Sequence, residues 1–226
     1  IINGRYISAK KDTDKKHGYG MKSIQDIVGK YIKQLHEPNH RFKSWEHCFM
    51  AFSDFNNDVD YLTLQLAFYL ASWGMYRGSS ELLQKDYLIH EPIVEIIRSN
   101  SALRKENIAS DDIKPINEIV KKIKDVYEVK NVSCTLVSKI LLGTLGCMPA
   151  LDRFFCDGWK ICEETKEFPI NLQNIISFAD KHKIEIKECK NCIKSDVIYP
   201  PMKIVDMYFW QIGYDEYLKK KNINSI

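Results

Sequence analysis

The sequence has 226 residues, of which 45% are hydrophobic, 12% aromatic and 28% charged, with a formal net charge of +3. These totals are typical of one sizeable globular domain, and the small net charge excludes a strongly basic field over the whole protein. Seven cysteines, an odd number without a regular framework, favour reduced thiols and a cytoplasmic location.

Residues 1–20 differ in composition from the rest of the chain. The run Lys10–Lys16 is dense in charge, and His17-Gly-Tyr-Gly20 is typical of a flexible link. We therefore expect a polar N-terminal tail or the remnant of an upstream domain. The first residue is not methionine and no apolar leader comes after it, so we expect a piece of a longer product without a secretory signal.

The predicted domain spans residues 21–221 and is organised around one stretch, Tyr61–Tyr76. Its apolar residues recur at steps of four and three, which places them on one face of a helix. The other faces are also mostly apolar, so we expect a buried central helix at about residues 58–77, too short and too polar to cross a membrane. The predicted fold is a single all-α domain of about eight helices with little or no sheet, followed by a frayed end at 222–226. The residues on the first face are Leu62, Leu66, Tyr69, Trp73 and Tyr76.

The end of this helix predicts a ligand-binding corner. Arg77 and the hydroxyls of Ser79 and Ser80 follow the large rings of Trp73 and Tyr76. An arginine, hydroxyls and helix-start amides suit a phosphate or carboxylate, and aromatic rings can stack on a planar ligand. The alternative is an ordinary turn between helices, with Arg77 paired to an acid. The leading functional interpretation is a binding or interaction module that uses this corner and needs no cofactor.

Apolar residues at helical spacing predict further helices to the end of the domain. A helix that begins near Pro115 has a lysine-rich side, which is either a solvated face or a nucleic-acid contact. Ser133 is placed to cap another helix, Pro149 to begin the next, and Pro201 to begin the last long one. Alternation of residue type over 183–187 indicates a short extended piece.

Two cysteines three positions apart, Cys189 and Cys192, have the spacing of half a zinc site. A complete site needs two more ligands, for which Cys156, Cys162 and His182 are available, but none of these forms a second close pair. We therefore expect free thiols and no metal.

The segment from Ser8 to Tyr31, within residues 7–31, contains Ser-Ala-Lys-Lys-Asp and then His-Gly-Tyr-Gly-Met-Lys-Ser-Ile-Gln-Asp-Ile-Val-Gly-Lys-Tyr. It resembles the last glycine motif and helix of histidine-kinase-like (GHKL) ATPase domains, which lie beside the ATP phosphates. The family's magnesium-binding asparagine helix and adenine-reading aspartate have no counterpart in this sequence. The resemblance implies a regulatory extension of an upstream ATPase, and the alternative is a simple linker.

A second resemblance covers residues 134–155, where a helix containing Lys139 is followed by an apolar segment with a proline that ends at Asp152. This arrangement is similar to the catalytic segment of helix-hairpin-helix DNA glycosylases. In that family, an aspartate after the hairpin assists departure of a flipped base and activates water. The glycine-rich hairpin is absent here and the spacing from lysine to aspartate is short. Without the resemblance, Asp152 is a charge that favours the start of a helix.

The sequence thus leaves three functional hypotheses: a module with a ligand or protein partner at the corner, an enzyme acting on nucleic acid, and an extension of an ATPase. The enzyme hypothesis requires Asp152 to lie in a cleft beside a basic rim. In this hypothesis Lys139 is a second chemical group and Arg77 binds phosphate. The module hypothesis allows Asp152 to be a buried cap or a surface charge. Substrate, oligomeric state and biological process do not follow from the sequence.

Overall fold

The structure is a computed structural model that describes residues 23–78, 80–127, 132–162 and 170–223. Within these residues it contains ten α-helices, four short 3₁₀ helices and no strand, so the all-α prediction is confirmed. The α-helices are α1 (Ile24–Leu35), α2 (Lys43–Ala51), α3 (Val59–Ser72), α4 (Glu91–Arg98), α5 (Ile113–Val126), α6 (Cys134–Thr144), α7 (Arg153–Ile161), α8 (Leu172–Lys181), α9 (Lys183–Cys192) and α10 (Pro201–Ile223). The 3₁₀ helices are η1 (Glu81–Gln84), η2 (Tyr87–His90), η3 (Ser101–Leu103) and η4 (Ser110–Asp112).

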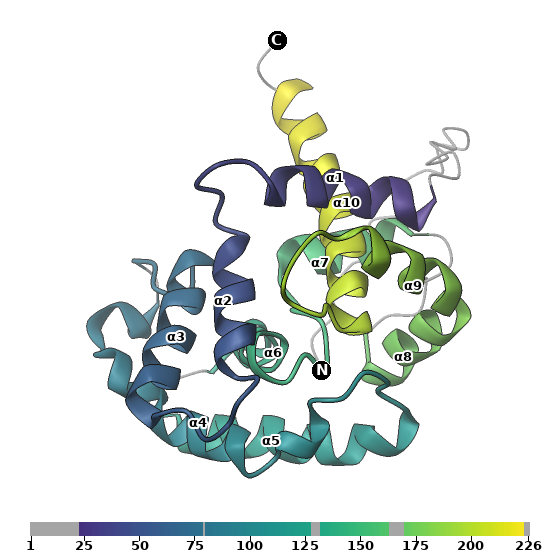
Figure 1. Ribbon diagram of the computed structural model, residues 1–226. Coiled ribbons are helices and arrows are strands. Elements are labelled where there is room, and N and C mark those ends of the chain that lie inside the picture. Colours follow the sequence, from purple (N-terminus) through teal and green to yellow (C-terminus); the bar gives the residue numbers. More distant parts are fainter. Residues whose placement is uncertain (1–22, 79, 128–131, 163–169, 224–226) are drawn as a thin grey trace, which may run out of the picture.

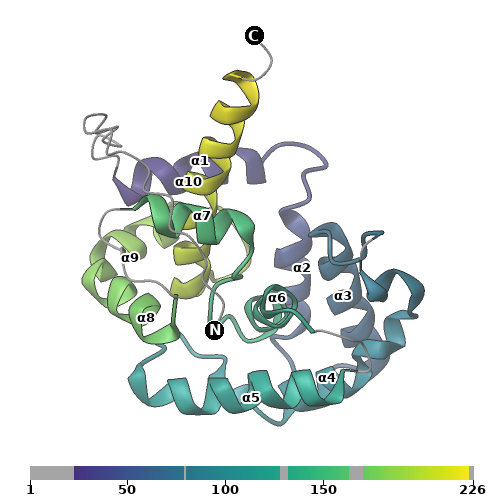
Figure 2. The ribbon, with the colours of Figure 1, turned by 180° about the vertical axis from the view of Figure 1, so that it is seen from behind.

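Helix α6 lies in the middle of the molecule and is seen end-on in both views (Figures 1 and 2). Helices α2 and α3 lie on one side of it, α4 and α5 run along one edge, and α7 to α10 lie on the other side. The last turns of α10 project beyond the other helices, and α1 crosses α10 near that end (Figure 1). One hydrophobic core contains buried residues from α1 through α10.

The predicted central helix is present as α3 but is shorter and less buried than the sequence suggested. Leu64 and Phe68 are each about half exposed, at 48% and 57%, so one side of α3 faces outward. The central position belongs instead to α6, in which every residue from Leu136 to Thr144 is buried. An apolar run on a helix therefore did not distinguish the middle of this core from its edge.

Helix α3 ends where glycine permits a left-handed backbone. Trp73 is its C-cap, and Gly74 has φ 74°. The amide of Met75 donates to the carbonyl of Leu70 at 2.9 Å, which is the six-to-one bond of a Schellman motif. The chain therefore turns at residue 74 rather than at 77, and this turn leaves the carbonyl of Trp73 available to a partner outside the helix.

Three local predictions were wrong. Apolar residues from Leu82 to Leu88 predict one helix after the corner, but the segment forms two 3₁₀ helices, η1 and η2. Residues 183–187 are the first half of α9 and not an extended piece, because Ile186 faces the core while Ile184 is exposed. The helix expected to begin at Pro149 begins at Arg153, so residues 145–152 are an irregular link between α6 and α7. The prediction that Pro201 begins the last long helix is confirmed.

The tail predicted for residues 1–20 lies outside the described residues, as does the end of the chain beyond 223. Within the described residues, none of the helices combines the length and the apolar character needed to cross a membrane.

Helices α7 and α10 touch backbone to backbone at two glycines. A Cβ added to Gly158 would lie well inside 3.0 Å of the carbonyl of Phe209, and one added to Gly213 would clash equally with the carbonyl of Phe154. Both helices therefore approach each other at a distance that only glycine allows. This contact fixes the start of α7, which carries Asp152, against α10.

We predict that Gly158→Ala lowers the free energy of unfolding by about 2 kcal/mol or more, since the added methyl group forces two packed backbones apart. Gly29→Ala is the matched control, because Gly29 is also inside a helix, α1, and nothing lies within 4 Å of its added Cβ. That variant should gain roughly 0.5–1 kcal/mol from helix propensity. Urea unfolding of both variants checks the prediction, which is contradicted if the two change stability in the same direction.

Candidate functional site

Lys139 lies on α6 with only 4% of its side chain exposed, and its ammonium joins three elements. Its Nζ donates to the carbonyl of Trp73 at 3.1 Å, lies 3.4 Å from Oδ2 of Asp152, and is 5.3 Å from the centroid of the Trp73 ring. The carbonyl end of a helix carries a partial negative charge, which stabilises a cation placed there. The structure therefore brings together Lys139 and Asp152 of the enzyme hypothesis and Trp73 of the predicted corner.

Asp152 is the N-cap of α7 rather than a residue of its first turn. Its Oδ1 accepts a hydrogen bond from the amide of Phe155 at 3.1 Å, while Oδ2 faces Lys139. The residue before it is held by α6: the amide of Leu151 donates to Ser138 Oγ at 2.8 Å, and Thr135 Oγ1 donates to the carbonyl of Leu151 at 2.9 Å. A carboxylate has about four acceptor positions, so Asp152 keeps acceptor capacity beyond the cap and the ion pair.

A second lysine–aspartate pair on α10 is more deeply buried. Nζ of Lys203 lies 2.8 Å from Oδ2 of Asp206, and the other oxygen of Asp206 accepts from the amide of Ala150 at 3.0 Å. Lys203 also donates to the hydroxyl of Tyr31 at 3.3 Å and lies 5.4 Å from the Trp73 ring centroid. This pair therefore anchors the link that ends at Asp152 and adds a second cation beside the same indole.

The indole of Trp73 ends a parallel stack of rings. Its ring is 5.3 Å from that of Phe42 at an interplanar angle of 9°, and Phe42 is 4.0 Å from Tyr31 at 11°. The guanidinium of Arg41, an exposed residue, lies 5.0 Å from the Trp73 centroid and 6.0 Å from that of Trp210. Arg41 thus covers the two indoles on the side that faces solvent. We name Arg41, Trp73, Lys139 and Asp152, with Lys203 and Asp206 behind them, the central cluster.

Aromatic rings continue from the central cluster along α10 toward the surface. Trp210 is stacked on Tyr214 at 4.9 Å, Phe154 lies 5.3 Å from Trp210, and Tyr217 lies 5.5 Å from Phe154. The guanidinium of Arg153, the exposed residue next to Asp152, lies 4.7 Å from the Phe154 ring and 5.0 Å from that of Tyr217. Rings with arginines over their faces are suited to unstacked bases and phosphates. We name these four rings and Arg153 the aromatic track.

Burial sets the ionisation behaviour of the central cluster. It lowers the pKa of Lys139, and the charge of Arg41 lowers it further, while Asp152 and Asp206 act in the opposite direction. Burial also raises the pKa of the Asp206 carboxyl, against the effect of its lysine partner. Removing one member of such a pair would leave an uncompensated buried charge, which typically costs about 3–5 kcal/mol. Lys139 is therefore a lysine that gives up its proton more readily than an exposed one.

Two residues of the predicted corner, Trp73 and Tyr76, contact different parts of the structure. Trp73 turns into the central cluster, whereas Tyr76 turns the other way, where its hydroxyl is 2.6 Å from Nε2 of His90. The hydroxyl of Tyr127, at the end of α5, bonds to the other ring nitrogen, so His90 is enclosed between two phenols. Burial lowers the pKa of His90 to about 4.

The remaining residues of the predicted corner are Arg77, Ser79 and Ser80. Arg77 is exposed, Ser79 lies outside the described residues, and Ser80 caps η1 by accepting from the amide of Leu82 at 3.2 Å. Anion binding by Arg77 and these serines stays a prediction. The ATPase-like segment, residues 7–31, is described only from Ser23 onward, so the hypothesis of an ATPase extension also stays a prediction.

All seven cysteines are free thiols. Cys189 is buried and Cys192 exposed on the same helix, α9, and among the described residues no three histidine, cysteine or acidic side chains gather in a way that could hold a metal ion.

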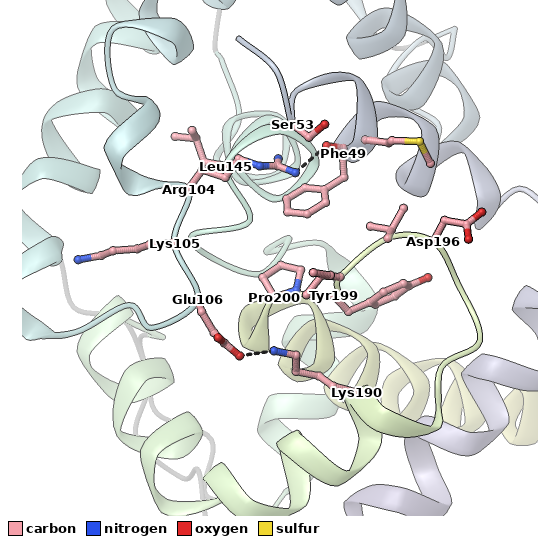
Figure 3. A pocket seen from close by; sticks show the side chains of 13 residues that line it. Phe49, Ser53, Arg104, Lys105, Glu106, Leu145, Lys190, Asp196, Tyr199 and Pro200 are labelled. Atoms are coloured by element: carbon pink, nitrogen blue, oxygen red, sulfur yellow. Dashed lines mark hydrogen bonds and ion pairs between the residues drawn. The ribbon is translucent and has the colours of Figure 1, made fainter.

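A separate cavity of about 370 Å³, drawn in Figure 3, is lined by Tyr199, Phe49 and Arg104 among others. Arg104 lines one wall and donates to the carbonyls of Phe49, at 2.8 Å, and Thr144. Two ion pairs involve residues that line this cavity: Lys190 with Glu106 (Figure 3) and Lys105 with Asp112. This cavity brings together none of the predicted site residues, which are Lys139, Asp152, Trp73, Tyr76, Arg77 and Ser80.

Several residues of the central cluster were missed by the sequence analysis. Lys203 and Asp206 interrupt an apolar helix three positions apart, and such a charged pair inside a buried stripe is a signal for a buried ion pair. Arg41 carries no comparable signal, because its role depends on two tryptophans 32 and 169 positions later (73 − 41 and 210 − 41).

We predict that His90 makes the protein less stable in acid. Its pKa is about 4 when folded and 6.5 in its ordinary state, so its contribution is complete above pH 6.5 and is lost as the pH falls toward 4, because the unfolded chain binds the proton first. The loss between pH 7.5 and 4.5 should be roughly 2–3 kcal/mol. Urea unfolding of His90→Gln should show a flatter pH profile, whereas His47→Gln, at an exposed position, should keep the native slope. Equal slopes in all three proteins would contradict the assignment.

No family model matches this chain, and neither curated proteins nor solved structures give a significant match. What the protein does must therefore be inferred from the geometry of its own residues.

Proposed function

We propose that this protein hydrolyses the bond between a base and its sugar in nucleic acid, with Asp152 and Lys139 as the chemical groups. The observation that carries the proposal is their meeting: the lysine of α6 and the aspartate that starts α7 lie 3.4 Å apart, with the indole of Trp73 beside the lysine. Both side chains are mostly buried, at 4% and 14% exposed, so the proposal requires that a covering side chain such as Arg41, which lies over that indole, moves aside to admit the substrate. The resemblance to helix-hairpin-helix glycosylases implies this pair, and the contact between the two side chains supports the proposal.

The reaction assigns one role to each residue. As the bond from the sugar carbon to the base nitrogen breaks, positive charge develops on the sugar, and the carboxylate of Asp152 stabilises it. Asp152 takes a proton from the attacking water while the water oxygen bonds to the sugar carbon. The base leaves with the electron pair and accepts a proton from the ammonium of Lys139, whose lowered pKa favours that transfer. The proton on Asp152 then returns to Lys139.

The surroundings of the pair suit a nucleic-acid substrate. A base must leave its stack to reach a buried group, and the aromatic track offers successive rings from the surface inward. Arg153 and Arg41 lie along this path and can contact phosphate. Because the whole chain is only mildly basic, binding would depend on this local surface. Seven free thiols fit a reducing compartment, so the proposal includes a cytoplasmic location.

We predict that Asp152→Asn abolishes base release, with a fall of roughly 100-fold or more. Asparagine caps a helix as well as aspartate does, so this variant keeps the cap of α7. It also removes the charge that pairs with Lys139, so a lower stability is expected and is measured with the activity. Asp157→Asn, on the same helix, is the matched control and should release base at the native rate. The assay uses single- and double-stranded oligonucleotides with modified or deaminated bases, with thermal unfolding to confirm that each variant is folded.

The proposal fails if the native chain releases no base from any substrate of such a panel, or if Asp152→Asn releases base as fast as the native chain.

A further inference from the structure

Arg104 is a partly buried arginine that forms no ion pair with a carboxylate of the described residues. Its guanidinium donates to the carbonyls of Phe49 and Thr144, which belong to the last turns of α2 and α6. By contrast, Arg98 pairs with Glu95 at 3.1 Å. The carbonyl ends of two helices stabilise a cation, but they carry only partial charges. Arg104 therefore keeps a positive charge to which an anion can bind.

The guanidinium also keeps hydrogen-bond donors for a ligand. The two carbonyls use two of its five N–H groups, and the ring of Phe49 lies against it, with its centroid 3.5 Å from the guanidinium carbon. Because Arg104 lines the cavity and is not fully buried, an anion inside the cavity can accept from the remaining N–H groups. Burial lowers the pKa of Arg104 to about 10, so the group is charged at neutral pH, and a bound anion would offset the effect of burial.

The other charged side chains of the lining leave this position to a ligand. The two lysines that line the cavity are in ion pairs, with Glu106 and with Asp112. Asp196 also lines the cavity, but its carboxylate points away from Arg104 (Figure 3). An anion that enters the cavity therefore finds its partner in Arg104.

The rest of the wall is largely apolar. Phe49 and Leu145 line it from the ends of α2 and α6, and residues 197–200 line it from the link to α10. Two apolar side chains of this lining are exposed, Ile198 at 81% and Met50 at 45%, so the cavity opens at the surface. Its volume of about 370 Å³ lies at the small end of the range for small-molecule sites. An apolar group placed against this wall would remove both surfaces from water.

We propose that this cavity binds small carboxylic acids with an apolar body, and that the carboxylate accepts hydrogen bonds from Arg104. Arginine suits a carboxylate because both groups are planar and can bond through two parallel N–H donors and two oxygens. The apolar wall favours such acids over small hydrated anions, which bury no apolar surface there. The site is separate from the central cluster, so this inference does not depend on the proposed function.

The test uses two probes, 3-phenylpropionate and hexanoate, titrated into the full chain and followed by the methyl signals of its isoleucines and methionines. We expect saturable binding of at least one probe with a Kd of about 1 mM or tighter, an ordinary affinity for a ligand of this size. The signals that shift should include those of Ile198 and Met50. The corresponding amides, which keep the shape and lose the charge, should bind roughly tenfold more weakly or worse. Acetate, which keeps the charge and loses the apolar body, should be weaker by a similar factor.

Two exposed isoleucines supply a matched pair of variants. Ile198→Asp places a negative charge at the wall of the cavity and should weaken binding of the probe roughly tenfold or more. Ile184→Asp is the control, because Ile184 is 72% exposed on α9 and does not line the cavity, and it should bind with native affinity. Neither side chain belongs to the core, so both variants should fold.

Arg104→Gln removes the charge and should also weaken binding roughly tenfold or more. This variant loses bonds to two helix ends, so its folding is checked by thermal unfolding, and Ile198→Asp decides the test if it is unfolded. The inference is overturned if the native chain binds neither probe or if the amides bind as tightly as the acids. Native affinity in Ile198→Asp or in folded Arg104→Gln would overturn it as well, and so would an equal loss in Ile184→Asp.

Discussion

The burial of one ammonium group, that of Lys139, is the constraint on which the middle of the structure depends. A charged group in a helical core must find compensation, and Lys139 obtains it from the carbonyl end of α3, from Asp152 at the start of α7 and from the face of an indole. Each partner belongs to a different element, so the position of Lys139 relates α3, α6 and α7 to one another. Replacing Lys139 by an apolar residue would leave the carboxylate of Asp152 without its ion-pair partner at the start of α7.

Two buried lysine–aspartate pairs around one tryptophan are more than the stability of this core requires. Buried ion pairs contribute little to stability on average, and well-packed apolar side chains often do as well. This core holds two lysine–aspartate pairs around a single tryptophan, with an arginine over its outer face. Groups whose ionisation is shifted by burial gather at functional sites more often than elsewhere. Burial also lowers the pKa of Arg104 beside the other cavity, to about 10, but in the central cluster the shifted lysine faces an aspartate, so two groups that can exchange a proton lie together.

The sequence predicted the fold class correctly because helical periodicity is a local property. Pro201 also marked a real boundary, since proline acts through its own backbone. The end of α3 at Gly74 was not predicted, because the apolar run continues past it to Tyr76. Which helix lies in the middle depended on tertiary contacts, so α3 was placed too deep, and α6, predicted as a helix capped by Ser133, was not recognised as the central one. Trp73 and Tyr76 of the predicted corner have different neighbours for a related reason: they are three positions apart on the chain, but once α3 ends at Ser72 the helical geometry that would align them no longer applies. Lys139 and Asp152 were found through a resemblance, and their partners on α10 became visible only in the folded chain.

The glycine contact between α7 and α10 has a consequence for how far these helices can slide. A movement of α10 by one residue along its axis would bring Ile212 or Tyr214 to the place of Gly213, and neither side chain fits against the backbone of α7. The axial position of Asp206, and with it the amide of Ala150 that it holds, is therefore set by atoms two helical turns away. Sequence drift at either glycine would be transmitted to the reacting groups as a displacement, even though neither glycine touches them.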